Sequence, residues 1–347
     1  MINCFEPSFG VVDFEALKGA LDSRAVGFGA TVSKFEQEYS SLSDKKFNIG
    51  LNSASSAAFI LYAYLYERHG ECVVYAPSLT FTSTVWAATH FGHKIVFVDV
   101  DQNALFDFEH YKKIRSFSHQ RAVVMPTLYG GVSHFSNEDY FGDEIVVVDS
   151  AHCVSPRCYS DYIFFSFHPV KPIAMSTGGL VSTNNKDFDK FCRSYRNFGR
   201  EPADHSYTIS SGGFNFYMNS LNASLGLAQL QRVFEFIKKR QENFEQITEQ
   251  CENAQFLHHD VSSSYYLGTL VLPKDVDNKS FIEYSKKCGV QSTLHYPPLH
   301  LTKYYETDKI TLRNTEYICK HLINFPIHQN LSREEVKKIS GVLKRVF

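Results

Sequence analysis

The sequence predicts an α/β protein: a mostly parallel, seven-stranded sheet sandwiched by helices, followed by a smaller C-terminal α+β domain. Seven short runs rich in β-branched or aromatic residues lie between residues 48 and 183 of the 347-residue chain. The first four runs are separated by segments long enough to form crossover helices. Strands that alternate with helical segments in this way are typical of a parallel sheet covered by helices.

The spacing between the predicted strands changes along the chain. The later strands are closer together, which favours an antiparallel strand or a tight hairpin near the end of the sheet. The crossover segments between the early strands are "SSAAFILYAYLYERHG", "STVWAATHFG" and "FEHYKKIRSFS". The predicted strands are "NIGL" (48–51), "VVYA" (73–76), "KIVFV" (94–98), "AVVMP" (122–126), "IVVV" (145–148), "YIFFSF" (162–167) and "GLVST" (179–183).

A stretch without proline, from 219 to 250, predicts one long helix that links two domains. Residues such as Leu221 and Leu225 recur on its successive turns. We expect a large domain over 1–235 and a small domain over 236–347. The small domain is predicted to contain a strand (265–273), a helix (279–289), an extended stretch (290–298) and a final helix that begins with Ser332 and Glu335 at capping-box spacing.

Composition narrows the classes of function. The net charge of −2 gives no basic excess for binding nucleic acid or an anionic membrane surface. No apolar stretch reaches the roughly 18 to 20 residues needed to span a bilayer, and the N-terminus does not resemble a signal peptide, so a cytoplasmic protein is expected. The eight cysteines form no C-x-x-C pair, which argues against a disulfide framework and against a zinc site, so no metal is expected.

Several polar residues follow predicted strands directly, where ligands bind in open parallel sheets. Asp149 ends one strand, Ser166 ends the next with Lys171 five residues on, and "NSASSAA" (52–58) joins the first strand to the first helix. Each of these features alone is more often a helix cap or a solvated loop residue. Together, a lysine, a carboxylate, hydroxyls and helix-start amides are the groups needed to hold pyridoxal phosphate.

The order of these residues resembles that in the DegT/StrS type of sugar aminotransferases, which are fold-type I enzymes dependent on pyridoxal phosphate. The resemblance runs nearly end to end. The matching segments are "GATVSKFE" (29–36), "SASSAA" (53–58), "PSLTF" (77–81), "DSAH" (149–152), "SFHPVK" (166–171) followed by Gly178 and Gly179, "GFNFYMNSLNASLGLAQL" (213–230) and "HYPPLH" (295–300).

The resemblance implies a role for each cofactor-facing residue. Lys171 would bind the cofactor covalently and later carry a proton between the substrate and the cofactor. Asp149 would pair with the pyridine nitrogen, His152 would contact the phenolic oxygen or pack beside the ring, and Phe81 would stack on its face. A sister branch of the family that dehydrates keto sugars has histidine in place of the lysine, so Lys171 favours amino transfer.

The resemblance also implies how the cofactor phosphate would be held. Ser55 and Ser166 would bind it with the backbone amides of Ala54 and Ser55, in the turn that begins at Ser53. An asparagine from the neighbouring subunit reaches the phosphate in this family, and Asn215 matches it. A homodimer with shared active sites is therefore expected.

Candidate substrate-binding residues are fewer and rest on weaker signals. His295, Tyr296 and His300 come from "HYPPLH". Arg196 comes from "RNFGR" (196–200), which a solvated helix end explains nearly as well as contact with a substrate. The expected reaction moves an amino group from an amino acid, with L-glutamate the first candidate, to a keto group of a nucleotide-linked deoxy sugar for aminosugar or surface-polysaccharide synthesis.

Three positions depart from the family pattern. Thr177 stands where glutamate is expected, Tyr217 replaces an arginine and Thr127 replaces a histidine. These departures leave two alternatives open. One is a transaminase that acts on a cyclitol or another ketone without a nucleotide, and the other is a protein of the same fold that regulates rather than catalyses.

Overall fold

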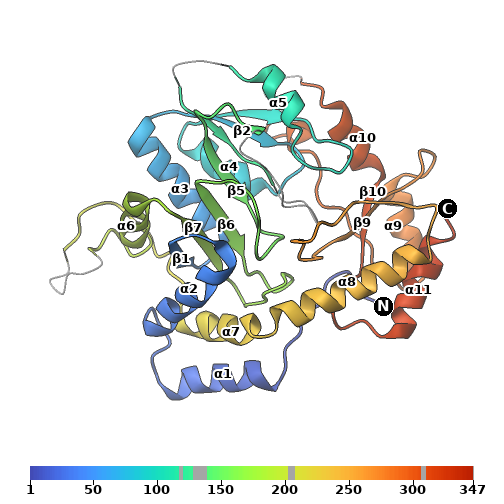
Figure 1. Cartoon of the computed structure of the whole chain (residues 1–347), viewed down its shortest axis with the longest axis horizontal. Helices are drawn as coiled ribbons and strands as arrows, with labels where there is room; N and C mark the ends of the chain where they lie inside the picture. The colour runs from blue at the N-terminus through green and yellow to red at the C-terminus, as the bar shows by residue number, and fades with distance from the viewer. Residues whose placement is uncertain (117–119, 128–138, 202–207, 306–309, 347) are drawn as a thin grey trace.

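A seven-stranded sheet forms the centre of the protein in the computed structural model, which describes residues 1–116, 120–127, 139–201, 208–305 and 310–346 (Figure 1). The strands follow one another in space in the order β1-β7-β6-β5-β4-β2-β3. Their bounds are β1 Phe47–Leu51, β2 Val73–Pro77, β3 Lys94–Val98, β4 Ala122–Val124, β5 Ile145–Asp149, β6 Tyr162–Ser166 and β7 Gly179–Thr183.

Strand β7 alone in this sheet runs against its neighbours. It pairs antiparallel with both β1 and β6, whereas the pairs β2–β3, β2–β4, β4–β5 and β5–β6 are parallel. The predicted mostly parallel sheet is therefore confirmed, and so is the antiparallel strand expected near its end. Because β1, β5 and β6 point the same way, their carboxyl ends meet at one edge of the sheet.

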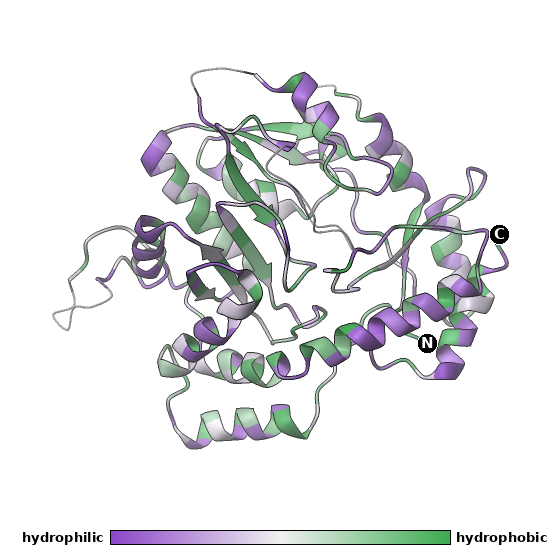
Figure 2. Cartoon of the chain, viewed as in Figure 1, coloured by the Kyte–Doolittle hydropathy of each residue, from purple (hydrophilic) through white to green (hydrophobic). Residues whose placement is uncertain are grey.

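Helices cover both faces of the sheet because side chains along each strand alternate between two apolar layers. Val147 and Phe164 face one layer, with α3 (Ala54–His69), α4 (Thr82–His90) and α6 (Lys186–Tyr195). Val148 and Phe165 face the other, with α2 (Ala30–Ser43) and α7 (Ser220–Leu230). The strands are hydrophobic along most of their length in Figure 2. Helices α1 (Val11–Asp22) and α5 (Phe108–Ile114) pack at the margins.

The C-terminal part folds around a second sheet of order β10-β9-β8 with antiparallel pairing. Its core includes Ile2, which bridges to Val290, so the start of the chain packs with its end. Ser332 and Glu335 form the predicted capping box. The elements are β8 Gln255–Phe256, β9 Gly268–Val271, α9 Asn278–Lys287, the short η2 Leu299–Leu301, α10 Arg313–His321, β10 Leu322–Phe325 and α11 Arg333–Leu343.

The single long helix predicted over 219–250 is wrong in one respect, because the structure has two helices there. Helix α7 ends at Leu230 and α8 spans Val233–Glu249, and the two run almost end to end in Figure 1. The backbone departs from helical geometry at Arg232, with φ −116° and ψ 0°, and the Arg232 guanidinium pairs with Asp13 of α1. The division into domains after residue 235 falls inside α8 and stays a prediction.

Across the described ranges, no helix combines the length and the apolar composition needed to cross a bilayer.

Candidate active site

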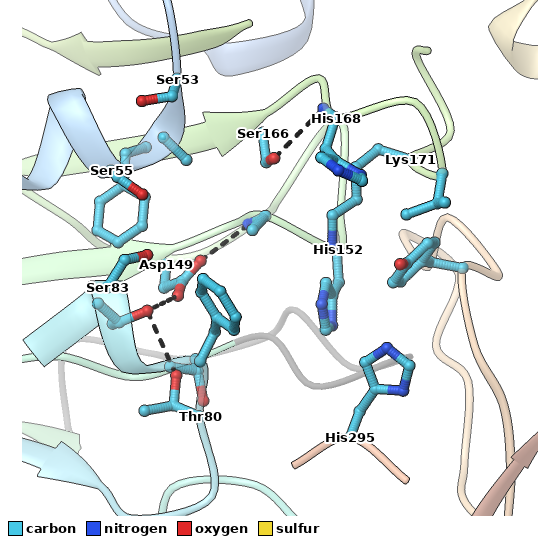
Figure 3. Close-up of a pocket in the computed structure, with 18 of the residues that line it drawn as sticks. Ser53, Ser55, Thr80, Ser83, Asp149, His152, Ser166, His168, Lys171 and His295 are labelled. Atoms are coloured by element: carbon cyan, nitrogen blue, oxygen red, sulfur yellow. Dashed lines mark hydrogen bonds between the residues drawn. The ribbon is translucent and has the colours of Figure 1, made fainter. Parts of the chain in front are cut away.

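A cavity of about 360 Å³ lies at the carboxyl ends of β5 and β6 and at the start of α3 (Figure 3). One wall comes from the large sheet and its loops, and the opposite wall comes from Tyr266, His295 and Tyr296 of the C-terminal part. Of the residues predicted for the cofactor or substrate, the cavity brings together Ser53, Ala54, Ser55, Phe81, Asp149, His152, Ser166, Lys171, His295 and Tyr296.

Lys171 is a buried amine, and no carboxylate among the described residues forms an ion pair with it. It lies in the turn after β6, where its backbone N–H donates to the His168 carbonyl (2.8 Å), and its side chain lies over the Tyr266 ring with Nζ 4.2 Å from the ring centroid. Burial lowers the pKa of Lys171 to about 7, against an opposing effect of the Asp149 charge. A large fraction of the amine is therefore neutral near pH 7 and able to act as a nucleophile or a base.

Two hydrogen bonds fix the orientation of the Asp149 carboxylate. Thr84 Oγ1 donates to Oδ2 (2.6 Å), and the Ala151 N–H donates to Oδ1 (3.0 Å). Burial raises the pKa of Asp149, while these hydrogen bonds and the Lys171 charge act in the opposite direction. The sequence reasoning missed Thr84. The sequence carries one signal for it, the four-residue spacing between Thr80 and Thr84. In the structure the two hydroxyls lie 3.4 Å from each other at the start of α4.

The turn between β1 and α3 brings the start of a helix to the cavity. Ser53 caps α3 by accepting the Ser56 N–H (3.1 Å), which leaves the first amides of the helix directed at the cavity. Gly179 permits this geometry, because a Cβ there would lie only 2.1 to 2.4 Å from backbone atoms of Ser53 and Ala54. Ser166 faces the same region in Figure 3 and accepts the His168 N–H (3.4 Å).

The opposite wall is a cluster of aromatic and imidazole rings. The His152 ring centroid is 4.6 Å from that of Tyr266, and His152 Nε2 lies 3.3 Å from the Tyr296 hydroxyl. Burial lowers the pKa of His152 well below its usual value and that of His295 to about 4, and the nearby Lys171 charge adds to both shifts. Both imidazoles are therefore neutral at pH 7. Tyr266 was not predicted as a site residue, since it was only part of a predicted strand.

Arg196 is not among the described residues that line the cavity. Its guanidinium donates to Oε1 of Glu36 in α2 (2.6 Å) and to the carbonyl of Gly50 in β1 (2.6 Å). With both groups buried, this pair ties α2 to β1 and to the end of α6. The geometry therefore gives Arg196 a structural place, whereas the sequence prediction put it at the substrate.

His300 and Asn215 also lie outside the lining of the cavity as the structure describes it. His300 is buried, and its Nδ1 lies 2.6 Å from the Ser78 hydroxyl. The Asn215 carbonyl accepts the side-chain N–H of Asn52 (3.2 Å), and its backbone bridges to Asn197. Phe81 lines the cavity, with its ring half exposed and 5.5 Å from that of Tyr296.

The three departures from the family pattern occupy different surroundings. Thr177 lines the cavity and donates to the Asn52 carbonyl (2.6 Å), next to the turn between β1 and α3. Thr127 is buried and bridges to Asp149. Tyr217 bridges to Leu51 and packs with Phe28 at 5.6 Å between ring centroids. Two of the three therefore adjoin the predicted cofactor-binding residues.

Comparison with known families gives a match over nearly the whole chain. The model of the DegT/DnrJ/EryC1/StrS aminotransferase family matches residues 8–344. The chain belongs to this family. Membership confirms the resemblance seen in the sequence and the predicted enzyme class, aminotransferase.

Two curated relatives are similar over almost their full length. The UDP-4-amino-4,6-dideoxy-N-acetyl-beta-L-altrosamine transaminase of Campylobacter jejuni is 26% identical, over 95% of this chain and 93% of that protein. The spore coat polysaccharide biosynthesis protein SpsC of Bacillus subtilis is 24% identical, over 98% and 95%.

Solved structures of similar proteins share the fold. PseC of Helicobacter pylori, an aminotransferase of pseudoaminic acid biosynthesis, superposes with a TM-score of 0.93 at 23% identity, covering 99% of this chain and 98% of that one. The PMP form of Spr1654 from Streptococcus pneumoniae, described as a sugar aminotransferase, gives 0.89 at 21% identity, covering 100% and 99%. These similarities confirm the predicted fold class.

Proposed function

We propose that the protein is a pyridoxal-phosphate-dependent aminotransferase that moves an amino group from an amino acid, with L-glutamate as the first candidate, to a keto group of a nucleotide-linked deoxy sugar. One observation carries the proposal. The amine of Lys171, with its pKa lowered by burial, lies in the same cavity as an oriented carboxylate and an open helix start.

The residues present fit this cofactor. Lys171 would hold it covalently, and Asp149 would pair with its ring nitrogen, which suits a carboxylate already held by Thr84 and Ala151. The amides at the start of α3 would take its phosphate, together with Ser55 and Ser166. Gly179 supports this assignment, since any larger residue would push the anion-binding turn out of place. When bound, pyridoxal phosphate withdraws electrons from the carbon next to the transferred nitrogen.

The protein's own groups supply proton transfer and a dry environment. The Lys171 amine, neutral in a large fraction near pH 7, would take a proton from one carbon and return it to another. Because His152 and His295 remain neutral there, neither of these two imidazoles adds a positive charge beside Lys171. Burial of Lys171 and Asp149 excludes water and strengthens the electrostatic interactions between them and a ligand.

The sugar substrate is proposed from the relatives. The C. jejuni relative is named as a UDP-aminosugar transaminase, and the B. subtilis relative as a polysaccharide biosynthesis protein. The exposed aromatic ring of Phe81 at the cavity offers a face on which a sugar or a cofactor ring can pack.

A homodimer with shared active sites is part of the proposal. Its support is the position of Asn215 outside the described lining of its own chain's cavity, which leaves this side chain available to a neighbouring cavity. Helix α1 adds a second argument, since Val11, Phe14 and Leu21 are 75%, 63% and 58% exposed. Burial of such side chains against a second copy would remove apolar surface from water. Measuring the molar mass by sedimentation equilibrium tests the dimer.

The absorbance spectrum of the purified protein tests the cofactor and the first half-reaction. After reconstitution with pyridoxal phosphate, wild-type protein is expected to show a band that shifts when glutamate is added. Lys171→Ala should show no such shift. Lys45→Ala is the matched control, because burial also lowers the pKa of Lys45, but that residue lies outside the cavity. If the wild type shows no band, the proposed function is contradicted.

Acceptors then separate the remaining alternatives. Protein that has first reacted with glutamate is mixed with a UDP-linked or dTDP-linked keto sugar, or with an inosose, which carries no nucleotide. Return of the original band with a nucleotide sugar alone supports the proposal. Return of the band with the inosose alone favours the cyclitol alternative. If glutamate-treated protein reacts with neither acceptor, a regulatory role is favoured.

A further inference from the structure

We propose that Asn324 and Thr269, two buried polar residues of the small sheet, hold the His295 ring as the neutral tautomer that carries its proton on Nε2. The ring then presents a hydrogen-bond donor at the cavity, directed at an oxygen next to the reacting carbon of a substrate. The identity of that substrate rests on the proposed function, whereas the tautomer does not.

The first step is the orientation of the Asn324 amide, which is fully buried in β10. Thr269 of β9 donates from Oγ1 to Asn324 Oδ1 (2.7 Å). On the other side, Asn324 Nδ2 lies 3.4 Å from the carbonyl oxygen of Thr293. A carbonyl oxygen can only accept, so turning the amide over would place two oxygens against each other. The NH₂ group therefore faces Thr293 and His295.

The second step is the proton on the imidazole. Asn324 Nδ2 lies 3.1 Å from His295 Nδ1, and because Nδ2 is a donor, Nδ1 must accept. A neutral imidazole that accepts at Nδ1 carries its proton on Nε2. The Thr293 hydroxyl, 3.4 Å from Nδ1, can donate to the same nitrogen and is compatible with this tautomer.

The third step is the charge of the ring. Burial and the nearby Lys171 amine keep the pKa of His295 near 4. Another neutral imidazole, His152, lies 6.5 Å away between ring centroids, and the Tyr296 ring is 4.8 Å away. Phe5 packs edge-on against the other side at 5.2 Å. These contacts favour a neutral ring, so His295 donates a hydrogen bond without adding charge to the cavity.

The fourth step is the ligand. His295 lines the cavity on the side of Lys171, and both are drawn there in Figure 3. A hydrogen-bond donor at this position suits an acceptor oxygen carried by the carbon atom next to the reacting carbon. Two sources share that chemistry: the carboxylate of the amino-acid donor, and a hydroxyl of the keto sugar next to its carbonyl carbon. A double-displacement reaction allows the Michaelis constants of the two substrates to be measured separately, which distinguishes the sources.

The tautomer is measured on the wild-type protein without cofactor. Histidine side chains labelled with ¹⁵N give different nitrogen signals for a protonated and an unprotonated ring nitrogen, and His295→Gln identifies the signals of this ring by their loss. At pH 7.5 the proton is expected on Nε2. A proton on Nδ1, or on both nitrogens, overturns the proposal whether or not the protein binds pyridoxal phosphate.

Asn324→Asp then tests the consequence for binding. The new carboxylate accepts from Nδ1, so the single proton of the neutral ring moves to Nδ1 and Nε2 no longer donates; the test is run at a pH at which the nitrogen signals show the variant ring to be neutral. The Michaelis constant of one substrate is expected to rise at least tenfold: glutamate if the oxygen is a carboxylate, the keto sugar if it is a hydroxyl. Thr269→Ser keeps the hydroxyl and should leave both constants unchanged. A reversed tautomer with neither constant altered overturns the assigned role in substrate binding.

A milder variant keeps this second test available if Asn324→Asp does not fold. Thr269→Val removes the donor that holds Asn324 Oδ1 but leaves the amide in place. It is expected to mix the two tautomers and raise the same Michaelis constant severalfold. Folded Thr269→Val protein with unmixed tautomers would contradict the role of Thr269.

Discussion

Two buried cations of this chain, Lys171 and Arg196, differ in what surrounds them. Arg196 is 2% exposed and donates to a carboxylate and to a backbone carbonyl, each at 2.6 Å. Lys171 is 9% exposed and rests on an aromatic face, and burial lowers its pKa to about 7. A buried cation with a close partner stabilises the fold, whereas one without such a partner gives up its proton easily and is available for chemistry.

The carboxylate of Glu36 shows the same contrast from the acidic side. Burial alone would raise its pKa, but the guanidinium groups of Arg196 and Arg193 outweigh burial and lower it. Asp149 is also buried, yet its hydrogen bonds with Thr84 and Ala151 and the charge of Lys171 do not offset burial, and its pKa is raised. A cationic group of a ligand beside Asp149, such as a protonated ring nitrogen, would therefore lower this pKa.

Exchanging the two kinds of cation gives the largest expected effect. Lys171→Arg places a guanidinium, which stays protonated, where a neutral amine is needed. Transaminase turnover is expected to fall at least a thousandfold, measured as glutamate-dependent formation of 2-oxoglutarate. The reciprocal change, Arg196→Lys, retains a cation beside Glu36 and should keep most of the turnover. Comparable losses in the two variants would contradict the distinction.

Removing each cation should move the stability in opposite directions. Arg196→Met leaves Glu36 buried with one guanidinium fewer, which is expected to cost roughly 3 to 5 kcal/mol in the free energy of unfolding. Lys171→Met removes a buried amine of similar volume and should stabilise the cofactor-free protein. Urea denaturation of both variants at pH 6 gives the comparison.

The stabilisation by Lys171→Met should depend on pH. Below pH 7 the amine is charged in both the folded and the unfolded state, so the cost of burying the charge is fully present. Between pH 7 and 10.5 the folded form loses the proton first, and the cost disappears as pH rises. The gain is therefore expected to be on the order of 4 to 5 kcal/mol at pH 6 and much smaller at pH 10. A gain independent of pH would contradict a lowered pKa at Lys171.

A smaller effect is expected from the hydroxyl that orients Asp149. Thr84→Val keeps the shape but removes the hydrogen bond to Oδ2, and turnover should fall about tenfold, which corresponds to about 1.4 kcal/mol. Thr82→Val makes the same change two residues earlier on α4, at an exposed residue, and should leave turnover unchanged. Equal rates in the two variants would show that Thr84 has no part in holding the carboxylate.

The sequence was sufficient to predict the sheet, because its strands are apolar runs of suitable length. It was also sufficient to place Asp149, Ser166 and the turn at Ser53 at one edge of the sheet, because these residues directly follow or join strands there, and Lys171 comes five residues after Ser166. It could not place Arg196, whose position in the chain gives no information on the direction of its side chain. Tyr266, Thr269 and Asn324 could not be found either, because they meet the site only through packing of distant segments.

The most direct test of Lys171 as the reactive amine is to fix the cofactor chemically and locate it. Protein reconstituted with pyridoxal phosphate is reduced with sodium borohydride, which makes the bond between cofactor and amine permanent, and is then digested and examined by mass spectrometry. The account predicts one modified peptide, with the added mass on Lys171. Modification of Lys45 or of surface lysines, with Lys171 unmodified, would contradict it.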